Sequence, residues 1–64
     1  MFFHYLAIDA GGNKIGRANL TQAQVEVHTS NLVVSGYILH TVSTPSPIDN
    51  TDEALLATVN HPLF

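Results

Sequence analysis

Hydrophobic residues fill the start of the chain and predict a β-hairpin. Residues 2–9 are almost all aromatic or aliphatic, which is typical of a strand buried on both faces. The glycine-rich residues 10–13 interrupt this run with side chains that accept positive φ, so the chain reverses there. Residues 14–20 form the returning strand, in which Gly16 indicates a bulge or the close approach of another element. We therefore predict an antiparallel hairpin over residues 2–20.

Residues 21–35 carry the alternation of a strand. Val25, Val27 and Thr29 are separated by polar residues, which is the two-residue period of a half-buried strand. All three are β-branched and therefore poor helix formers. We favour an extended hairpin over residues 23–42 for these reasons.

The same segment also carries the signals of a helix. Thr21 and Gln24 have the spacing of a capping box at a helix start. Gly36 stands where a helix would end, since glycine accepts the left-handed conformation that is common there. A helix followed by a strand is therefore the alternative structure for residues 23–42.

The rest of the chain predicts a strand, a loop and a helix. Residues 36–42 are rich in β-branched and aromatic residues, and two prolines make residues 43–48 a loop. Asp49 or Asn50 caps a helix over residues 50–60, whose acidic first turn suits the helix dipole. The predicted fold class is α+β: a small antiparallel three-stranded β-meander followed by a helix, in the order β-β-β-α.

Composition narrows the classes of protein. The chain forms one small domain or a partial domain over residues 1–64, and it has no cysteine for a disulfide or a thiolate metal site. With 45% hydrophobic and 11% charged residues, it is too apolar to be disordered. The net charge is −3 and the only cations are Lys14 and Arg17, too few to bind a nucleic acid or an anionic membrane. We expect a cytoplasmic protein with neither as a partner.

The hairpin resembles a known phosphate-binding element. Leu6-Ala7-Ile8-Asp9-Ala10-Gly11-Gly12-Asn13-Lys14 is similar to the LxIDxGGTK pattern that opens sugar kinases of the ROK family, with bacterial N-acetylmannosamine kinases as its nearest members. The glycine turn before residues 37–39 and the loop and helix start over residues 44–55 resemble the elements that follow in that family. The resemblance implies the start of an actin-like, ribonuclease H-like domain.

The resemblance also implies an ATP site with Mg²⁺ on the hairpin. No zinc is expected, because the chain lacks the cysteine and histidine cluster that binds zinc in the family. Backbone N–H groups of a tight glycine turn form a concavity for phosphate oxygens, and Lys14 adds a positive charge. Asp9 would position Mg²⁺ through water, because hard cations favour carboxylate oxygens. The implied ATP-binding residues are Ala7, Ile8, Asp9, Ala10, Gly11, Gly12, Asn13 and Lys14.

The chain departs from the kinase pattern in three respects. Asn13 stands in place of a threonine, and residues 21–35 lengthen the connection to the third strand. The family's later catalytic aspartate and sugar-binding residues do not occur before Phe64. We therefore expect a truncated or remnant ATP-binding segment of an amino-sugar kinase, inactive alone, that is a homo-oligomer or lacks the remainder of a larger domain.

The alternative is a small non-catalytic binding or structural module. Phe3-His4-Tyr5, Ala7-Ile8-Asp9-Ala10 and Gly12 also resemble the opening of the cytoplasmic module of type II secretion platform proteins. In that module Gly36-Tyr37-Ile38 would follow a helix over residues 22–35. A helix there favours the secretion-type module, in which the glycine hairpin is only a turn, and a long hairpin favours the kinase.

Four histidines are the remaining candidates for chemistry. They are far apart in the sequence and lack the spacing of metal-ligand pairs such as H-x-x-x-H. We interpret them as surface or strand-face residues rather than a metal site. They are His4, His28, His40 and His61.

Overall fold

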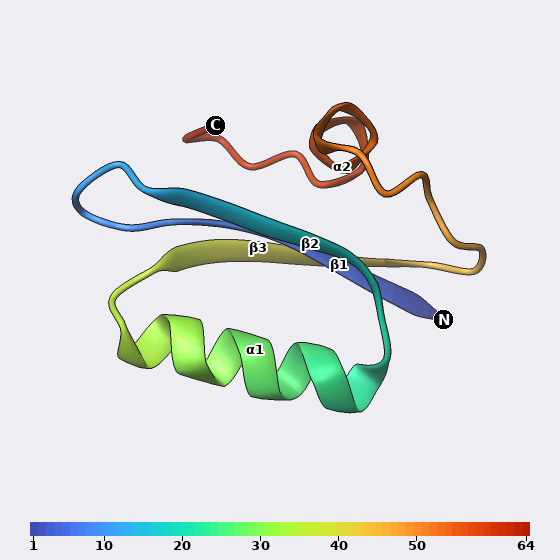
Figure 1. Cartoon of the computed structure of the whole chain (residues 1–64), viewed down its shortest axis with the longest axis horizontal. Helices are drawn as coiled ribbons and strands as arrows, with labels where there is room; N and C mark the ends of the chain where they lie inside the picture. The colour runs from blue at the N-terminus through green and yellow to red at the C-terminus, as the bar shows by residue number, and fades with distance from the viewer.

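The computed structural model describes residues 1–64 as a sheet with one helix on each face (Figure 1). The elements follow in the order β1 (Phe2–Ile8), β2 (Lys14–Leu20), α1 (Gln22–Val34), β3 (Ile38–Thr44) and α2 (Asp52–Thr58). The sheet order is β2-β1-β3 and both pairings are antiparallel, which confirms the α+β class with a three-stranded antiparallel sheet. Neither helix is long and apolar enough to cross a membrane.

The strand interpretation of residues 21–35 is wrong, because this segment forms α1. The hydroxyl of Thr21 accepts a hydrogen bond from the N–H of Gln24, whose side chain accepts one from the N–H of Thr21. At the other end Gly36 has a φ of 89°, and the N–H groups of Gly36 and Tyr37 donate to carbonyls of the last helical turn. The helical alternative is therefore confirmed, and both of its end signals act as the sequence predicts.

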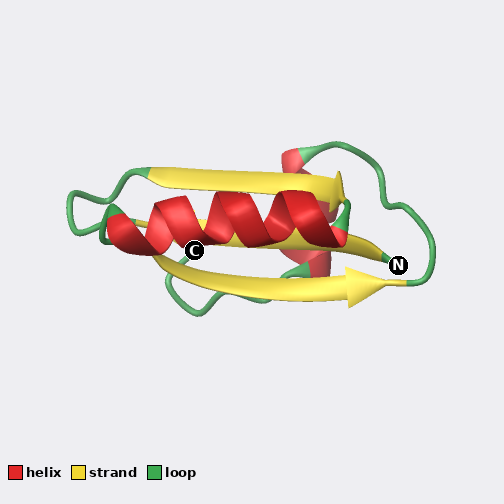
Figure 2. Cartoon of the chain, turned by 90° about the horizontal axis from the view of Figure 1, so that it is seen from below, coloured by secondary structure: helices red, strands yellow, loops and turns green.

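Packing against the sheet explains why the helix forms despite its β-branched residues. Val25, His28, Thr29 and Leu32 recur at the spacing of one helical face and are buried or half-buried. The Thr29 hydroxyl donates to the Val25 carbonyl at 2.6 Å, so its polar group is satisfied within the helix. Seen from below, α1 runs along the strands and covers the middle of the sheet (Figure 2). Because β1 lies in the middle of the sheet, β3 pairs with β1 rather than with β2, and the strands do not form a meander. With α1 between β2 and β3, the element order is β-β-α-β-α.

The central strand β1 is buried on both faces, as its hydrophobic run predicts. His4, Tyr5, Leu6 and Ala7 each expose 3% of their surface or less. Alternate side chains of a strand point to opposite faces. Tyr5 and Ala7 therefore pack with Val25 of α1, while His4 and Leu6 lie on the face that α2 covers.

Helix α2 closes the second face. Its Leu55 packs against Leu6, and both are buried. Thr51 caps the helix in place of the predicted Asp49 or Asn50, because its hydroxyl accepts a hydrogen bond from the N–H three residues later. The loop before α2 leaves the end of β3 and passes around the end of the sheet near the N-terminus to reach the second face (Figure 1).

A bulge near the end of β2 ties this loop to the sheet. One residue more lies on β2 than on β1 between two paired positions, and Asn19 at the bulge has a left-handed φ of 60°. The Asn19 side-chain amide donates to the Ile48 carbonyl at 2.7 Å and accepts from the Ile48 N–H at 2.9 Å. The loop is thus held to the sheet by two hydrogen bonds from one side chain.

We expect Asn19→Ala to lower the free energy of unfolding by about 2–3 kcal/mol. The variant loses the two bonds to Ile48, at about 1 kcal/mol each, and places an alanine in the left-handed region, which costs about 1 kcal/mol more. Asn19→Gly loses the bonds without the strain, so it should be less destabilising than Asn19→Ala. Urea unfolding of both variants, with the exposed Asn31→Ala as control, measures the difference. Equal losses for alanine and glycine would contradict the assigned backbone strain.

Candidate functional site

The predicted glycine turn is present, and the side chain of Asp9 accepts hydrogen bonds from Asn13 across the turn. The Asn13 N–H donates to Asp9 Oδ1 at 2.8 Å, and Asn13 Nδ2 donates to Asp9 Oδ2 at 2.9 Å. On the main chain, the Gly12 N–H donates to the Asp9 carbonyl and the Asp9 N–H donates to the Asn13 carbonyl, both at 3.1 Å. Gly12 has a φ of 81°, a conformation that glycine adopts without strain.

These contacts determine the charge of Asp9 and which N–H groups of the turn are already hydrogen-bonded. The Asn13 side chain, and then its backbone N–H, lower the pKa of Asp9, so the carboxyl is ionised at neutral pH. The ionised carboxylate occupies N–H donors that a phosphate oxygen would need. A bound Mg²⁺ would likewise compete with the hydrogen-bond donors on each carboxylate oxygen.

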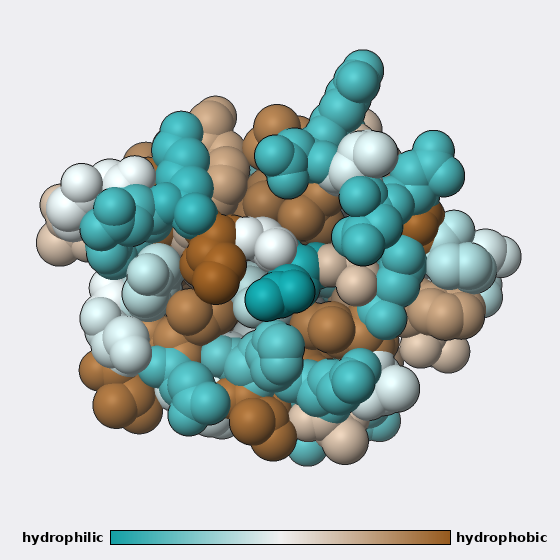
Figure 3. All heavy atoms as spheres, viewed as in Figure 1, coloured by the Kyte–Doolittle hydropathy of each residue, from teal (hydrophilic) through white to brown (hydrophobic).

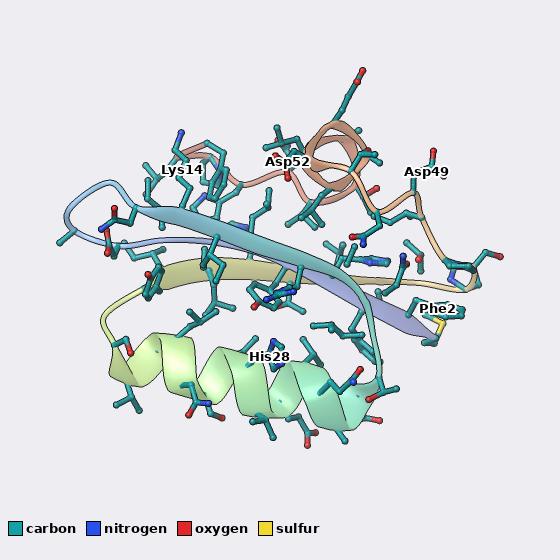
Figure 4. The ribbon with its side chains drawn as sticks, in the orientation of Figure 1. Phe2, Lys14, His28, Asp49 and Asp52 are labelled. Carbon is teal, nitrogen blue, oxygen red and sulfur yellow. The ribbon has the colours of Figure 1, made fainter.

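The other residues implied as an ATP site are spread over different environments. Ala7 is fully buried beneath α1, so it offers nothing to a ligand. Lys14 points away from the turn, toward the C-terminal segment (Figure 4), and its Nζ lies 5.2 Å from the centre of the Phe64 ring. The structure therefore brings Asp9 and Asn13 together but directs Lys14 elsewhere. Ile8 is half-buried, and Ala10, Gly11 and Gly12 are exposed.

A shallow groove lies beside Lys14, between β2 and α2. Its volume is about 270 Å³. Small-molecule sites usually measure about 300–1,000 Å³, so the groove is small for a cofactor. Gly16 lines the groove, and a larger residue would not fit there, because an added Cβ would lie 2.6 Å from Leu55 and 2.8 Å from Leu6. The lining residues are Leu6, Lys14, Ile15, Gly16, Asp52, Leu55, Leu56 and Phe64.

His4 is fully buried on the α2 face and belongs to a hydrogen-bond chain that the sequence does not predict. Its Nδ1 accepts from the Asn19 N–H at 3.0 Å, so Nε2 carries the proton and donates to the Thr44 hydroxyl at 2.8 Å. That hydroxyl donates onward to the Ser46 carbonyl at 2.6 Å. Every polar side-chain atom in this series of hydrogen bonds has a partner. The arrangement fits a neutral His4 ring.

His61 and His28 make structural contacts of the same kind. His61 is buried; its Nδ1 accepts from the Leu63 N–H, and its Nε2 donates to the Ile38 carbonyl at 3.1 Å. His28 points from α1 toward the sheet (Figure 4), and its Nδ1 lies 3.3 Å from the Tyr5 hydroxyl. No three His, Cys, Asp or Glu side chains are grouped as metal ligands. The interpretation as surface or strand-face residues holds for His4, which lies on a buried face of β1, and is wrong for His61, which is buried in the C-terminal segment.

Comparison of the chain with models of protein families, with curated proteins and with solved structures finds no match. The ROK-kinase and secretion-module resemblances both remain predictions. The geometry of the glycine turn leads to a direct test of the kinase resemblance.

We expect ATP with Mg²⁺ to leave the backbone amide signals of residues 11–14 unshifted up to millimolar concentration. The Asp9 carboxylate already accepts hydrogen bonds in the turn, and its negative charge repels a phosphate. An NMR titration measures the shifts. Saturable shifts that Gly12→Val abolishes would contradict this expectation and show that the turn binds phosphate as the kinase resemblance implies.

We expect the free energy of unfolding to fall as the pH drops below about 6.5. Burial lowers the pKa of His4 from its ordinary value of 6.5, so in this range the unfolded chain binds more protons than the folded chain. The stability that neutral His4 contributes is complete above 6.5 and is lost as the pH falls through the folded pKa. Urea unfolding over a pH series tests this. His4→Gln should flatten the dependence and the exposed His40→Gln should keep it; an unchanged slope in His4→Gln would contradict the assignment.

Proposed function

We propose that the chain is a small non-catalytic docking module of the kind found in the cytoplasmic part of type II secretion platform proteins. The observation that carries the proposal is helix α1 between β2 and β3, which gives residues 2–44 the order β-β-α-β. That helix is the feature by which the secretion-type resemblance differs from the kinase-type resemblance. The self-closed turn at Asp9 supports the same choice, since it suits a structural hairpin.

The outer surface of α1 supports a docking function. Val27, Val33 and Val34 expose 60%, 62% and 89% of their surface, respectively. Val27 and Val34 are seven residues apart, so they lie on one side of the helix. Figure 3 shows hydrophobic residues along the lower rim of the molecule, over α1, set among hydrophilic ones. Exposed apolar side chains rimmed by polar residues are typical of protein-binding surfaces.

The kinase-type function is the second candidate, and the glycine turn is the observation that favours it. Gly12 has the positive φ of a tight phosphate-binding turn. We rank it below the docking module, because α1 takes the place of the long hairpin on which the kinase interpretation depends. The ATP titration described above decides between a phosphate-binding turn and a structural one.

Binding of the chain to purified cytoplasmic components of a type II secretion platform tests the docking function. We expect a saturable complex in titration calorimetry, and a loss of affinity of tenfold or more, about 1.4 kcal/mol, in the double variant Val27→Lys, Val34→Lys. Both positions are exposed, so the lysines should leave the fold intact, which circular dichroism checks.

A matched control comes from the opposite face. Leu56 of α2 is also an exposed hydrophobic residue, and Leu56→Lys should leave the affinity unchanged. The proposal fails if the unmodified chain binds none of these components. Equal weakening by Leu56→Lys would contradict docking through α1.

A further inference from the structure

The two edges of the sheet differ in how well they are protected against pairing. Strand β2 carries both cations of the chain, Lys14 and Arg17, and ends in the bulge at Asn19. Charges and bulges are the features by which natural edge strands avoid pairing with other chains. Strand β3 has the sequence Ile-Leu-His-Thr-Val-Ser-Thr, with no acidic residue, lysine, arginine, glycine or proline, and pairs with β1 in an unbroken register. The unprotected edge is therefore β3.

The register shows which backbone groups of β3 are free. Backbone hydrogen bonds of successive residues in a central antiparallel strand point alternately to its two neighbours. The Asp9 N–H donates to the Asn13 carbonyl, so the odd-numbered residues of β1 bond to β2 and the even-numbered residues bond to β3. The even-numbered residues of β3 are their partners. Leu39, Thr41 and Ser43 therefore direct their N–H and carbonyl groups away from β1, toward the open edge.

We propose that two copies of this chain pair antiparallel through β3, with Thr41 on the twofold axis, to form one continuous six-stranded sheet. In this register Thr41 faces the partner's Thr41 and Leu39 faces the partner's Ser43, so every outward backbone group of these residues has a partner. A shift by two residues in either direction leaves some of them unpaired. The free edge of β3 is thus complementary to itself.

The side chains of β3 favour a second copy as the occupant of this edge. No charge lies on the strand, so two copies do not repel one another there. Ile38 is 58% exposed although it pairs with the half-buried Ile8, and in the dimer it lies beside the partner's Thr44. The outer surface of α1 lies on a face of the sheet, so this pairing neither requires nor blocks the proposed docking function.

Sedimentation velocity from micromolar to millimolar concentration tests the pairing. We expect the unmodified chain to form a species of twice the 6.9 kDa monomer mass. Thr41→Pro removes an N–H that points outward and leaves the bonds to β1 intact, so the dimer should be lost. Thr41→Lys should abolish it as well, because two ammonium groups would meet at the axis. Thr41→Val keeps the shape and should remain dimeric.

Amide hydrogen exchange identifies the surface, including the case in which Thr41→Pro fails to fold. The Thr41 N–H should become protected as concentration rises, while the Gly16 N–H on the β2 edge should not. A monomer at millimolar concentration, a dimer that persists in folded Thr41→Lys, or protection at Gly16 in place of Thr41 would each overturn the proposal. The proposal would also be overturned if β3 bound an extended peptide but did not pair with a second copy.

Discussion

Burial of β1 on both faces is the constraint on which the rest of the structure depends. A chain of 64 residues buries little surface, and its few fully buried side chains are concentrated in this strand. Each helix is needed because one side of β1 would otherwise face water: α1 covers Tyr5 and α2 covers Leu6. The same double burial encloses His4, a polar ring that is tolerable only because Asn19 and Thr44 satisfy both of its nitrogens.

Features that depend on neighbours in sequence could be predicted, and features that depend on distant partners could not. The β1 run, the glycine turn and the capping box at Thr21 follow from residues a few positions apart. The choice of helix over strand for residues 22–34 depends on whether Val25 and Leu32 find a sheet face to cover, which alternation within the segment does not reveal. The bonds from Asn19 to Ile48 join positions that no local pattern connects.

The candidate site shows the same division. The sequence places glycines in the turn and an asparagine where the kinase pattern has threonine, and the structure gives that difference a consequence. The Asn13 side-chain amide donates a hydrogen bond to Asp9 Oδ2 at 2.9 Å. Asn13 thereby helps to hold the Asp9 carboxylate within the turn. The Asp9 carboxylate thus accepts the N–H groups of the turn that a bound anion would need.

Charge distribution determines how far an assembly through the sheet can grow. Lys14 and Arg17 lie on β2, and the acidic residues lie in the turn and on the helices or just before α2, so β3 alone among the sheet edges is free of charge. An uncharged edge strand can pair with a strand of another chain, and repeated pairing at both edges of every sheet would give a fibre. Twofold pairing consumes β3 in both copies and leaves only β2 at the outside, where the cations and the bulge at Asn19 oppose further addition. The asymmetry between the two edges thus favours a closed dimer over an open polymer.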